Sequence, residues 1–148
     1  MTSQPQALPA RSGEFFAPLP LAFVGLLVVN DYWAKARFHN ALTGKLSDVA
    51  LCFFMPLFCS ELLGICFGVS TRTRLWIGGM TTALLFTLLE VVEPVTEVAL
   101  SLLTWLGPRL GMTRHFAMTR DPTDLYCVLI VPLALWYGYR RLTHRRVT

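Results

Sequence analysis

The chain has 148 residues, of which 54% are hydrophobic and only 15% are charged, and its mean hydropathy is +0.52. A soluble domain carries roughly 25% charged residues, so this composition favours one membrane-embedded domain over a soluble one. The net charge of +4 is modest, and the basic residues form no continuous stripe with interleaved aromatic residues, which argues against nucleic-acid binding.

Three of the four cysteines, Cys52, Cys59 and Cys66, repeat at seven-residue spacing within one apolar run. This spacing places them along one helix face, as small hydrophobic residues. No CxxC pair or paired Cys/His spacing is present. We therefore expect reduced cysteines that pack in the protein interior, and neither a structural metal nor a cofactor.

The apolar runs divide the chain into three parts. Residues 1–16 are polar and predict a disordered tail, residues 17–139 predict a transmembrane domain, and residues 140–148 form a basic tail. About 20 residues span the hydrocarbon layer of a bilayer. We therefore predict an all-α, polytopic membrane protein with four transmembrane helices, which lie in Ala17–Trp33, Val49–Val69, Leu75–Val92 and Leu125–Tyr139.

Local signals refine these helices. Pro56 should kink the second helix, and Ser60, Gly64 and Gly68 form a ladder of small residues that lets membrane helices approach closely. Asp121 is a candidate N-cap for the last helix. Its capping position is supported by Pro122 at the first helical position.

Two stretches between the helices are harder to assign. Lys35–Leu46 is expected to form a loop after the first helix. Val95–Leu106 follows Pro94 and is too short to cross a bilayer, so it is expected to be an interfacial or re-entrant helix, or an extension of the third helix. Ala34-Lys35-Ala36 has the small-x-small pattern of a signal-peptide cleavage site, but the polar residues before it are atypical of such a site.

An even number of crossings places both termini on one side of the membrane. Seven basic residues fall on that side and six on the other, so the count alone barely decides the orientation. The basic cluster in residues 140–148 lies directly after the last helix and favours the cytoplasm. We expect a multi-pass protein of the inner (plasma) membrane with both termini in the cytoplasm.

This topology brings charged residues from distant parts of the chain to the non-cytoplasmic helix ends. Lys45 and Asp48 share a helix face, and Glu90 lies deep in its apolar run without a capping role. Buried charges persist only when they are paired and hydrogen-bonded. We therefore predict a paired cluster whose candidate ligand-binding residues are Lys45, Asp48, Glu90, Glu93, Arg120 and Asp124.

Several acidic residues of the chain also have a purely structural interpretation. Asp48 and Asp124 would lie in first helical turns, where the helix dipole favours a negative charge. Asp31 can pair with Lys35 four residues later, or it can point into the same cluster. Glu61 can be protonated and hydrogen-bonded in the packed interior.

The spacing of these polar residues resembles that of the VanZ-like family of small bacterial membrane proteins. Lys45-Leu46-Ser47-Asp48 is similar to a Lys-x-x-His element of that family, and Glu90-Val91-Val92-Glu93 to a Glu-x-x-Gln element. Arg120-Asp121-Pro122-Thr123-Asp124 resembles the third element, with Val128 where asparagine is expected. The resemblance implies a role in the cell envelope or in glycopeptide tolerance.

Three functions remain open from the sequence. The first is a non-enzymatic envelope protein that binds a membrane lipid or a cell-wall precursor head group, with Lys45 and Arg120 on phosphate. The second is a membrane-embedded lipid-modifying enzyme with Glu90 as general base, although no GxSxG or HExxH motif is present. The third is a proton-coupled small transporter, which with only four helices would need to form a homo-oligomer.

Overall fold

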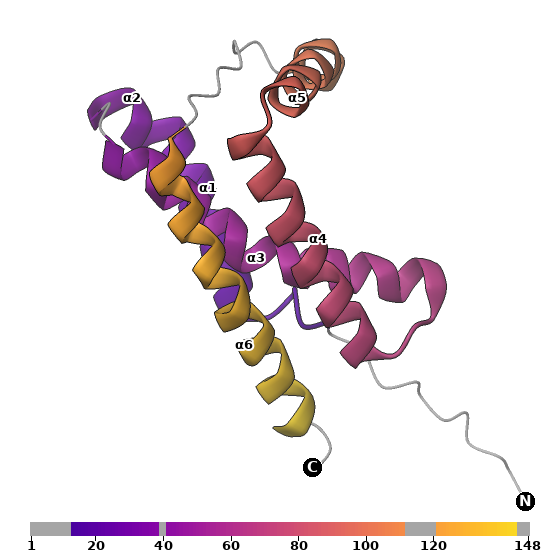
Figure 1. Cartoon of the computed structure of the whole chain (residues 1–148). Coiled ribbons are helices and arrows are strands. Elements are labelled where there is room, and N and C mark those ends of the chain that lie inside the picture. The colour runs from indigo at the N-terminus through magenta and orange to yellow at the C-terminus, as the bar shows by residue number, and fades with distance from the viewer. Residues whose placement is uncertain (1–12, 39–40, 112–120, 145–148) are drawn as a thin grey trace, which may run out of the picture.

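The computed structural model of the chain describes residues 13–38, 41–111 and 121–144. Within these ranges all regular structure is helical, and no strand is present (Figure 1). The predicted all-α class is therefore confirmed. Two helical segments, Leu42–Phe67 and Thr71–Val91, are long and apolar enough to cross a membrane. They fall in the second and third predicted runs.

The first helical stretch is longer than predicted. Helix α1 (Pro18–Val29) continues without interruption into the π-helix η1 (Asn30–Ala34) and then into α2 (Lys35–Phe38). The loop predicted over Lys35–Leu46 is therefore wrong, because the chain is helical up to residue 38 and again from residue 41. Alanine, lysine, arginine and leucine make up more than half of residues 35–46, and all four have high helix propensity.

Helix α3 (Ala41–Phe67) begins before the predicted start at Val49. Lys45 and Asp48 consequently lie in its second turn, and the helix-dipole explanation predicted for Asp48 is wrong because that effect is confined to the first turn. Pro56 lies inside the helix, and Figure 1 shows that α3 changes direction along its length. The helix ends at Gly68, whose φ of 57° is the left-handed conformation typical of a helix C-terminus.

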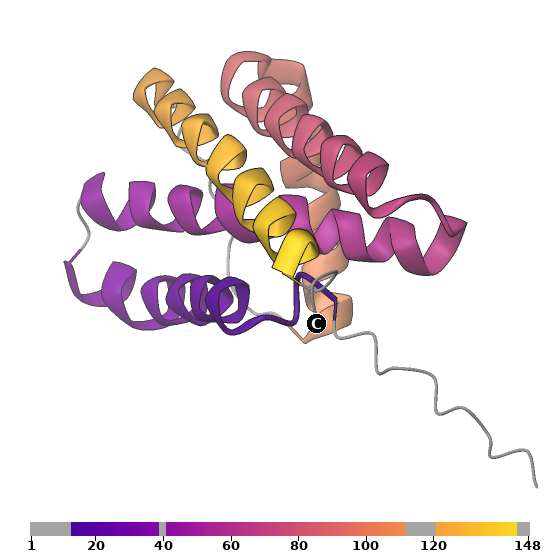
Figure 2. The same cartoon turned by 90° about the horizontal axis from the view of Figure 1, so that it is seen from below.

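Helix α3 is the centre of the bundle. It contacts α1 on one side, and on the other it contacts α4 (Thr71–Val91) and α6 (Ile130–His144) (Figure 2). The contact between α3 and α4 is the most extensive in the described part of the chain. A Cβ atom at Gly78 of α4 would lie only 2.4 Å from the backbone carbonyl oxygen of Pro56, so these two backbones pack directly against each other.

Helix α5 (Glu93–Leu106) does not extend α4, because the backbone turns at Val92 with φ −104° and ψ 100°. The hydroxyl of Thr96 stabilises this corner by donating a 2.6 Å hydrogen bond to the carbonyl of Leu89. Figure 1 shows α5 turned away from the axis of α4. The continuous-extension alternative is therefore excluded. A short 3₁₀ helix, η2 (Gly107–Leu110), follows α5.

The last helical stretch begins as predicted. Asp121 is the N-cap of the 3₁₀ helix η3 (Pro122–Leu129), which leads directly into α6. The hydrophobic core between these helices has two clusters of buried residues. Their members are Cys52, Phe86, Cys127 and Val131 in one cluster, and Phe53, Leu57, Leu75 and Ala134 in the other.

Residues 13–16, which the sequence assigns to the N-terminal tail, lie against this bundle. Glu14 is buried, and the ring of Phe15 packs edge-on against Phe58 with 5.2 Å between the ring centroids. The packed region of the chain therefore starts before the predicted domain boundary at residue 17.

Candidate functional site

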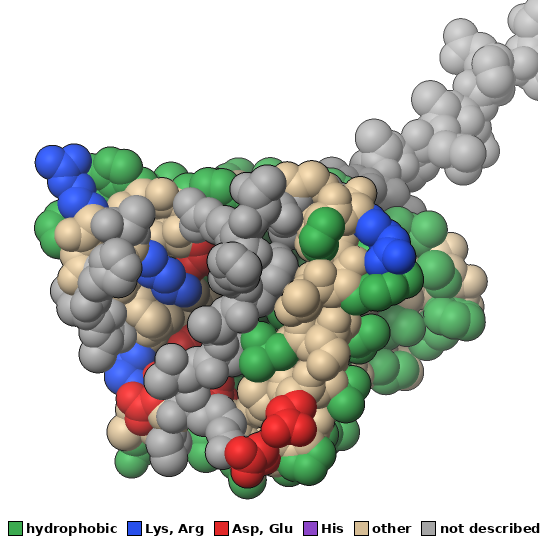
Figure 3. All heavy atoms as spheres, turned by 90° about the horizontal axis from the view of Figure 1, so that it is seen from above, with side chains coloured by type: hydrophobic (Ala, Val, Ile, Leu, Met, Phe, Trp, Pro, Cys, Tyr) green, Lys and Arg blue, Asp and Glu red, His purple; other side chains and the backbone are tan. Residues whose placement is uncertain are grey.

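Charged side chains of both signs gather over one part of the face shown in Figure 3. These side chains come from four places, which are the end of the first helical stretch, the first turns of α3, the end of α4 and the start of η3. We call this group the charged cluster. Its members are Asp31, Lys35, Lys45, Asp48, Glu90, Asp121 and Asp124.

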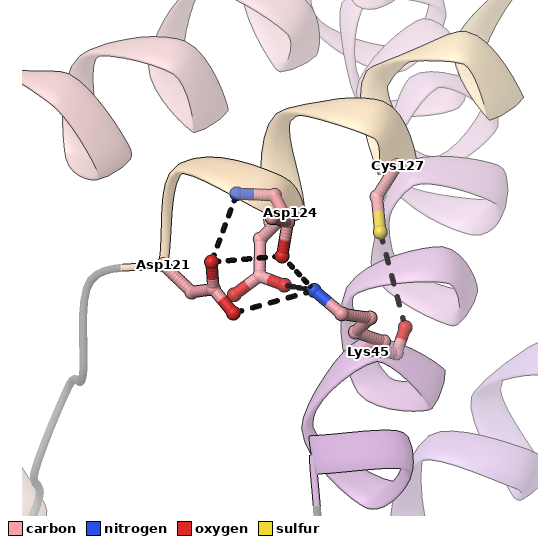
Figure 4. A network of polar contacts seen from close by, with 5 residues as sticks. Lys45, Asp121, Asp124 and Cys127 are labelled. Carbon is pink, nitrogen blue, oxygen red and sulfur yellow. Dashed lines mark hydrogen bonds and ion pairs between the residues drawn. The ribbon is translucent and has the colours of Figure 1, made fainter.

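Lys45 joins α3 to η3. Its Nζ atom lies 2.5 Å from Oδ1 of Asp124 and 3.5 Å from Oδ2 of Asp121, and it also donates a hydrogen bond to the hydroxyl of Thr123 (Figure 4). The side chain of Asp124 is 12% exposed, whereas that of Lys45 is 36% exposed. Residues almost 80 positions apart in the chain are thus connected through one ammonium group, at the boundary between the protein interior and its surroundings.

Asp121 caps the first turn of η3 with its side chain. Its Oδ1 atom accepts a 2.9 Å hydrogen bond from the backbone N–H of Thr123 and a 2.7 Å hydrogen bond from the hydroxyl of the same residue. These two hydrogen bonds, together with the nearby positive charge of Lys45, lower the pKa of Asp121 below its ordinary value. The capping role predicted for this residue is confirmed.

The lowered pKa of Asp121 predicts an acid-dependent loss of stability. Because the folded-state pKa lies below the unfolded one, the contribution is present above about pH 4 and disappears as the pH falls through the folded pKa. Asp121→Asn keeps the capping oxygen but has no charge to lose, so its unfolding temperature should fall less than that of the wild type between about pH 5 and pH 3. Asp121→Ala should be less stable than Asp121→Asn throughout this range. Equal pH dependence of the wild type and Asp121→Asn in thermal unfolding would contradict this.

Asp48 interacts electrostatically with charged side chains of both signs in the charged cluster. Its half-buried carboxylate is repelled by the carboxylates of Asp124 and Glu90 and is attracted by the ammonium groups of Lys35 and Lys45. It forms no hydrogen bond or ion pair with any residue that the structure describes. A partly desolvated carboxylate between two others is unfavourable unless a cation joins it.

A network of neutral and charged groups connects the π-helix to α3. The buried amide of Asn30 donates hydrogen bonds to the carbonyl of Thr43 at 2.5 Å and to the hydroxyl of Ser47 at 2.7 Å. Ser47 in turn donates to Asp31 at 2.7 Å, and Lys35 pairs with the same carboxylate at 2.7 Å. Both interpretations of Asp31 therefore hold, because it pairs with Lys35 and also faces α3.

The structure brings together four of the six predicted site residues, Lys45, Asp48, Glu90 and Asp124. Their function as ligand-binding residues stays a prediction. Glu93 is exposed at the first position of α5, and Arg120 lies outside the described residues.

Sequence reasoning missed Asn30, Ser47 and Thr123. Asn30 carried a usable signal, because an amide inside an apolar run needs a buried partner. The hydroxyl groups of Ser47 and Thr123 carried no such signal, because serine and threonine hydroxyls in helices usually form hydrogen bonds with nearby backbone groups.

The described members of the charged cluster include five carboxylates and two ammonium groups. Such a site favours a cationic group over a free anion. Among the described residues, no group of three His, Cys, Asp or Glu side chains is arranged to hold a metal ion.

The resemblance to the VanZ-like family rests on the sequence pattern of these polar residues and stays a prediction. The pattern itself is partly visible in the fold, because its elements at Lys45, Glu90 and Asp121–Asp124 meet in the charged cluster. Comparison with protein families, with curated proteins and with solved structures found no match to this chain.

Proposed function

We propose that this chain is an integral membrane protein that crosses the bilayer four times and binds the head group of an amine-bearing lipid or lipid-linked envelope precursor in the charged cluster. The observation that carries this proposal is Asp48, a half-buried carboxylate that lies beside Glu90 and Asp124 and has no direct cationic partner among the described residues.

The outer surface of the bundle supports a membrane location. Soluble monomers rarely expose contiguous apolar patches larger than a few hundred Å². Here large apolar side chains are exposed on α3, α4 and α6 alike. They include Leu62, Ile65, Phe67, Trp76, Met80, Leu84, Leu133 and Trp136, each at least 49% exposed. Lipid tails are the natural surroundings for such a surface.

The lengths of the remaining two helical stretches are consistent with four crossings. The stretch from α1 through α2 is about 30 Å long at 1.5 Å per residue, which matches the hydrocarbon thickness. The last crossing was predicted to be short, but η3 rises about 2.0 Å per residue and adds about 16 Å to the length of α6. The 3₁₀ segment therefore gives the last stretch enough length to cross.

The distribution of arginine supports the orientation. The first turn of α4 carries Arg72 and Arg74, and the last part of α6 carries Arg140 and Arg141. Figure 1 shows that α4 starts and α6 ends at the end of the bundle opposite the start of α6. Arginine near helix ends favours the cytoplasmic side. The charged cluster would then face the outer leaflet, where head groups of lipids and envelope precursors are accessible.

The contacts of Lys45 decide which part of a head group the cluster binds. An ammonium group has three N–H donors, and Lys45 uses them on Asp121, Thr123 and Asp124. It therefore has no free donor for a phosphate. The side of the cluster formed by Asp48, Glu90 and Asp124 is negative, so a primary or quaternary ammonium group of the ligand complements it.

Native mass spectrometry of the purified protein tests this proposal through the variant Asp48→Asn. We expect wild-type protein to retain a lipid with an amine in its head group and Asp48→Asn to lose at least tenfold of that occupancy. The same variant removes repulsion between carboxylates, so its unfolding temperature in detergent should rise by a few degrees. Glu97→Gln is the matched control, because Glu97 is an exposed acid on α5.

Loss of lipid together with gain of stability is the signature of a binding residue held in an unfavourable setting. A purely structural Asp48 would lose stability on substitution. Unchanged lipid occupancy in Asp48→Asn, or equal loss in Glu97→Gln, would exclude the charged cluster as the head-group site.

A further inference from the structure

A second polar group lies at the opposite end of α3. It consists of Glu14 from the N-terminal segment, Glu61 from α3 and Arg74 from α4, and we call it the Glu–Arg–Glu site. The side chains of Glu14 and Arg74 are only 7% and 8% exposed, and Oε2 of Glu14 lies 3.9 Å from a terminal nitrogen of Arg74. Charged groups are rarely buried to this extent unless they are paired.

Two glycines let the backbone approach these side chains. A Cβ atom at Gly13 would lie 2.0 Å from the carboxyl carbon of Glu61, and a Cβ atom at Gly64 would lie 1.4 Å from a guanidinium nitrogen of Arg74. Any larger residue at either position would displace the charged group. The segment Gly13–Ala17 is therefore fitted closely over the Glu61 carboxyl group.

Two carboxyl oxygens of this site lack a hydrogen-bond donor. Oε2 of Glu14 and Oε2 of Glu61 are both buried, and neither receives a hydrogen bond from a donor in the described part of the chain. Ionised carboxylates only accept hydrogen bonds, whereas a protonated carboxyl group can donate one to a neighbouring carboxylate. A single proton on one of the two acids would therefore supply the missing donor.

The charge of the site leads to the same conclusion. Two carboxylates and one guanidinium carry a net charge of −1 when all are ionised, and a buried net charge is strongly unfavourable. A single proton makes the site neutral. The guanidinium of Arg74 also donates a 3.0 Å hydrogen bond to the hydroxyl of Thr71, which keeps it oriented beside the two acids.

The neighbouring elements offer no other described group that balances this charge. Helix α1 has no ionisable side chain. At this end of the bundle Arg141 donates a hydrogen bond to the hydroxyl of Tyr137 at 3.1 Å, and Arg72 lies over the ring of Tyr139 at 5.6 Å from its centroid. Arg140 lies over the ring of Trp136 at 4.5 Å from its centroid, so the three other described arginines at this end each contact an aromatic residue of α6.

We propose that Glu14 and Glu61 bind one proton between their side chains beside Arg74, and that this proton holds the segment Gly13–Ala17 on α3 and α4. Loss of the proton leaves the buried carboxylate of Glu14 and the half-buried carboxylate of Glu61 against one cation. Their repulsion is relieved when Glu14 moves out, so the segment dissociates as the pH rises. The ligand of this site is the proton itself, and the site works independently of what the charged cluster binds.

Infrared spectroscopy tests the shared proton directly. Wild-type protein in lipid nanodiscs should show the carbonyl band of a protonated carboxylic acid at neutral pH, and the band should titrate away as the pH is raised. Glu61→Gln and Glu14→Gln should each remove it, because the one remaining carboxylate then balances Arg74 without a proton. Absence of the band in the wild type, or its persistence in both variants, would overturn the proposal.

Hydrogen–deuterium exchange, corrected for the intrinsic pH dependence of exchange, tests the movement of the segment. Amides of residues 13–17 should exchange at least tenfold faster in the wild type once the infrared band has titrated away. Glu61→Gln should keep them protected at every pH, because a glutamine amide donates to Glu14 as the protonated acid does. Gly13→Ala should expose them at every pH, whereas Gly25→Ala, whose Cβ would meet no atom within 4 Å, should leave wild-type behaviour unchanged.

Either of two exchange results would contradict the proposal. One is protection of residues 13–17 that does not change with pH in the wild type. The other is a Glu61→Gln variant that loses protection over the same pH range as the wild type, because that variant has no shared proton to lose.

Discussion

Replacing Gly78 with alanine is expected to destabilise the protein by about 1–3 kcal/mol, the usual cost of overpacking a core. The new Cβ atom would lie 2.4 Å from the carbonyl oxygen of Pro56 and 3.1 Å from the backbone nitrogen of Ser60. Both of these are backbone atoms of α3 and cannot rotate away. The two helices must therefore separate, and the buried Leu57 and Leu75 between α3, α4 and α6 lose packing with them.

Thermal unfolding of the purified protein in detergent measures this effect. Gly25→Ala is the matched control, because the same substitution in α1 meets no atom within 4 Å. Alanine favours a helix over glycine by about 1 kcal/mol, so the control should be as stable as the wild type or more stable. Equal unfolding temperatures for Gly78→Ala and Gly25→Ala would contradict the direct backbone contact between α3 and α4.

The helices themselves could be predicted because their signals are local. A run of apolar residues is sufficient to identify a candidate crossing, and the second and third predicted runs became α3 and α4. The start of η3 was equally readable, since Asp121 and Pro122 act within one turn. Signals of this kind depend on the chain's own backbone and need no knowledge of distant contacts.

The charged cluster could be predicted only in part. The expectation that acids and bases at helix ends meet on one side correctly joined Lys45 to Asp124. The sequence could not show that the ammonium group of Lys45 is held by oxygen atoms of Asp121, Thr123 and Asp124. The predicted contact of Lys45 with a phosphate stays a prediction. The number of free donors on a side chain is a property of the folded contacts.

Of the Glu–Arg–Glu site, the sequence singled out only Glu61 as a buried acid, and its partners could not be predicted. Glu14 lies in a polar stretch that reads as a tail, and Arg74 lies at a helix start that reads as a solvated, cytoplasmic positive charge. Their pairing depends on Gly13 and Gly64, which leave space for the carboxyl group and the guanidinium. Glycines that leave space for a neighbouring side chain recur at no regular spacing, so a sequence pattern does not reveal them.

Helix α3 connects the two polar groups. Lys45 and Asp48 lie near its start and Glu61 near its end, and its middle carries the buried Phe53 and Leu57. A shift of α3 along its axis would therefore disturb both groups at once. Helix α3 is held against the first helical stretch by apolar packing, such as the stacked rings of Phe23 and Phe53, and by the hydrogen bonds of the Asn30 network. These hydrogen bonds are directional, which makes Asn30 an important position for the arrangement.

Asn30→Leu is expected to destabilise the protein by about 1–3 kcal/mol, the cost of leaving buried polar groups without a partner. Leucine has the same number of side-chain heavy atoms, branched at the same carbon, and is not smaller than asparagine, so the substitution leaves no cavity and removes the hydrogen bonds. The Ser47 hydroxyl loses its donor, the Thr43 carbonyl loses a 2.5 Å hydrogen bond, and the π-turn at Asn30 loses its attachment to α3. The unfolding temperature should fall by several degrees.

A double-mutant cycle with Ser47→Ala separates the hydrogen bond from general packing. If Asn30 stabilises the fold through Ser47, the double variant Asn30→Leu/Ser47→Ala should be only slightly less stable than Asn30→Leu alone, with a coupling of about 0.5–3 kcal/mol. Val29→Leu provides the control, because the same residue is introduced one position earlier at a side chain that is 57% exposed. Strictly additive effects of the two substitutions, or a loss in Val29→Leu as large as in Asn30→Leu, would show that the amide of Asn30 does not fix the first helical stretch to α3.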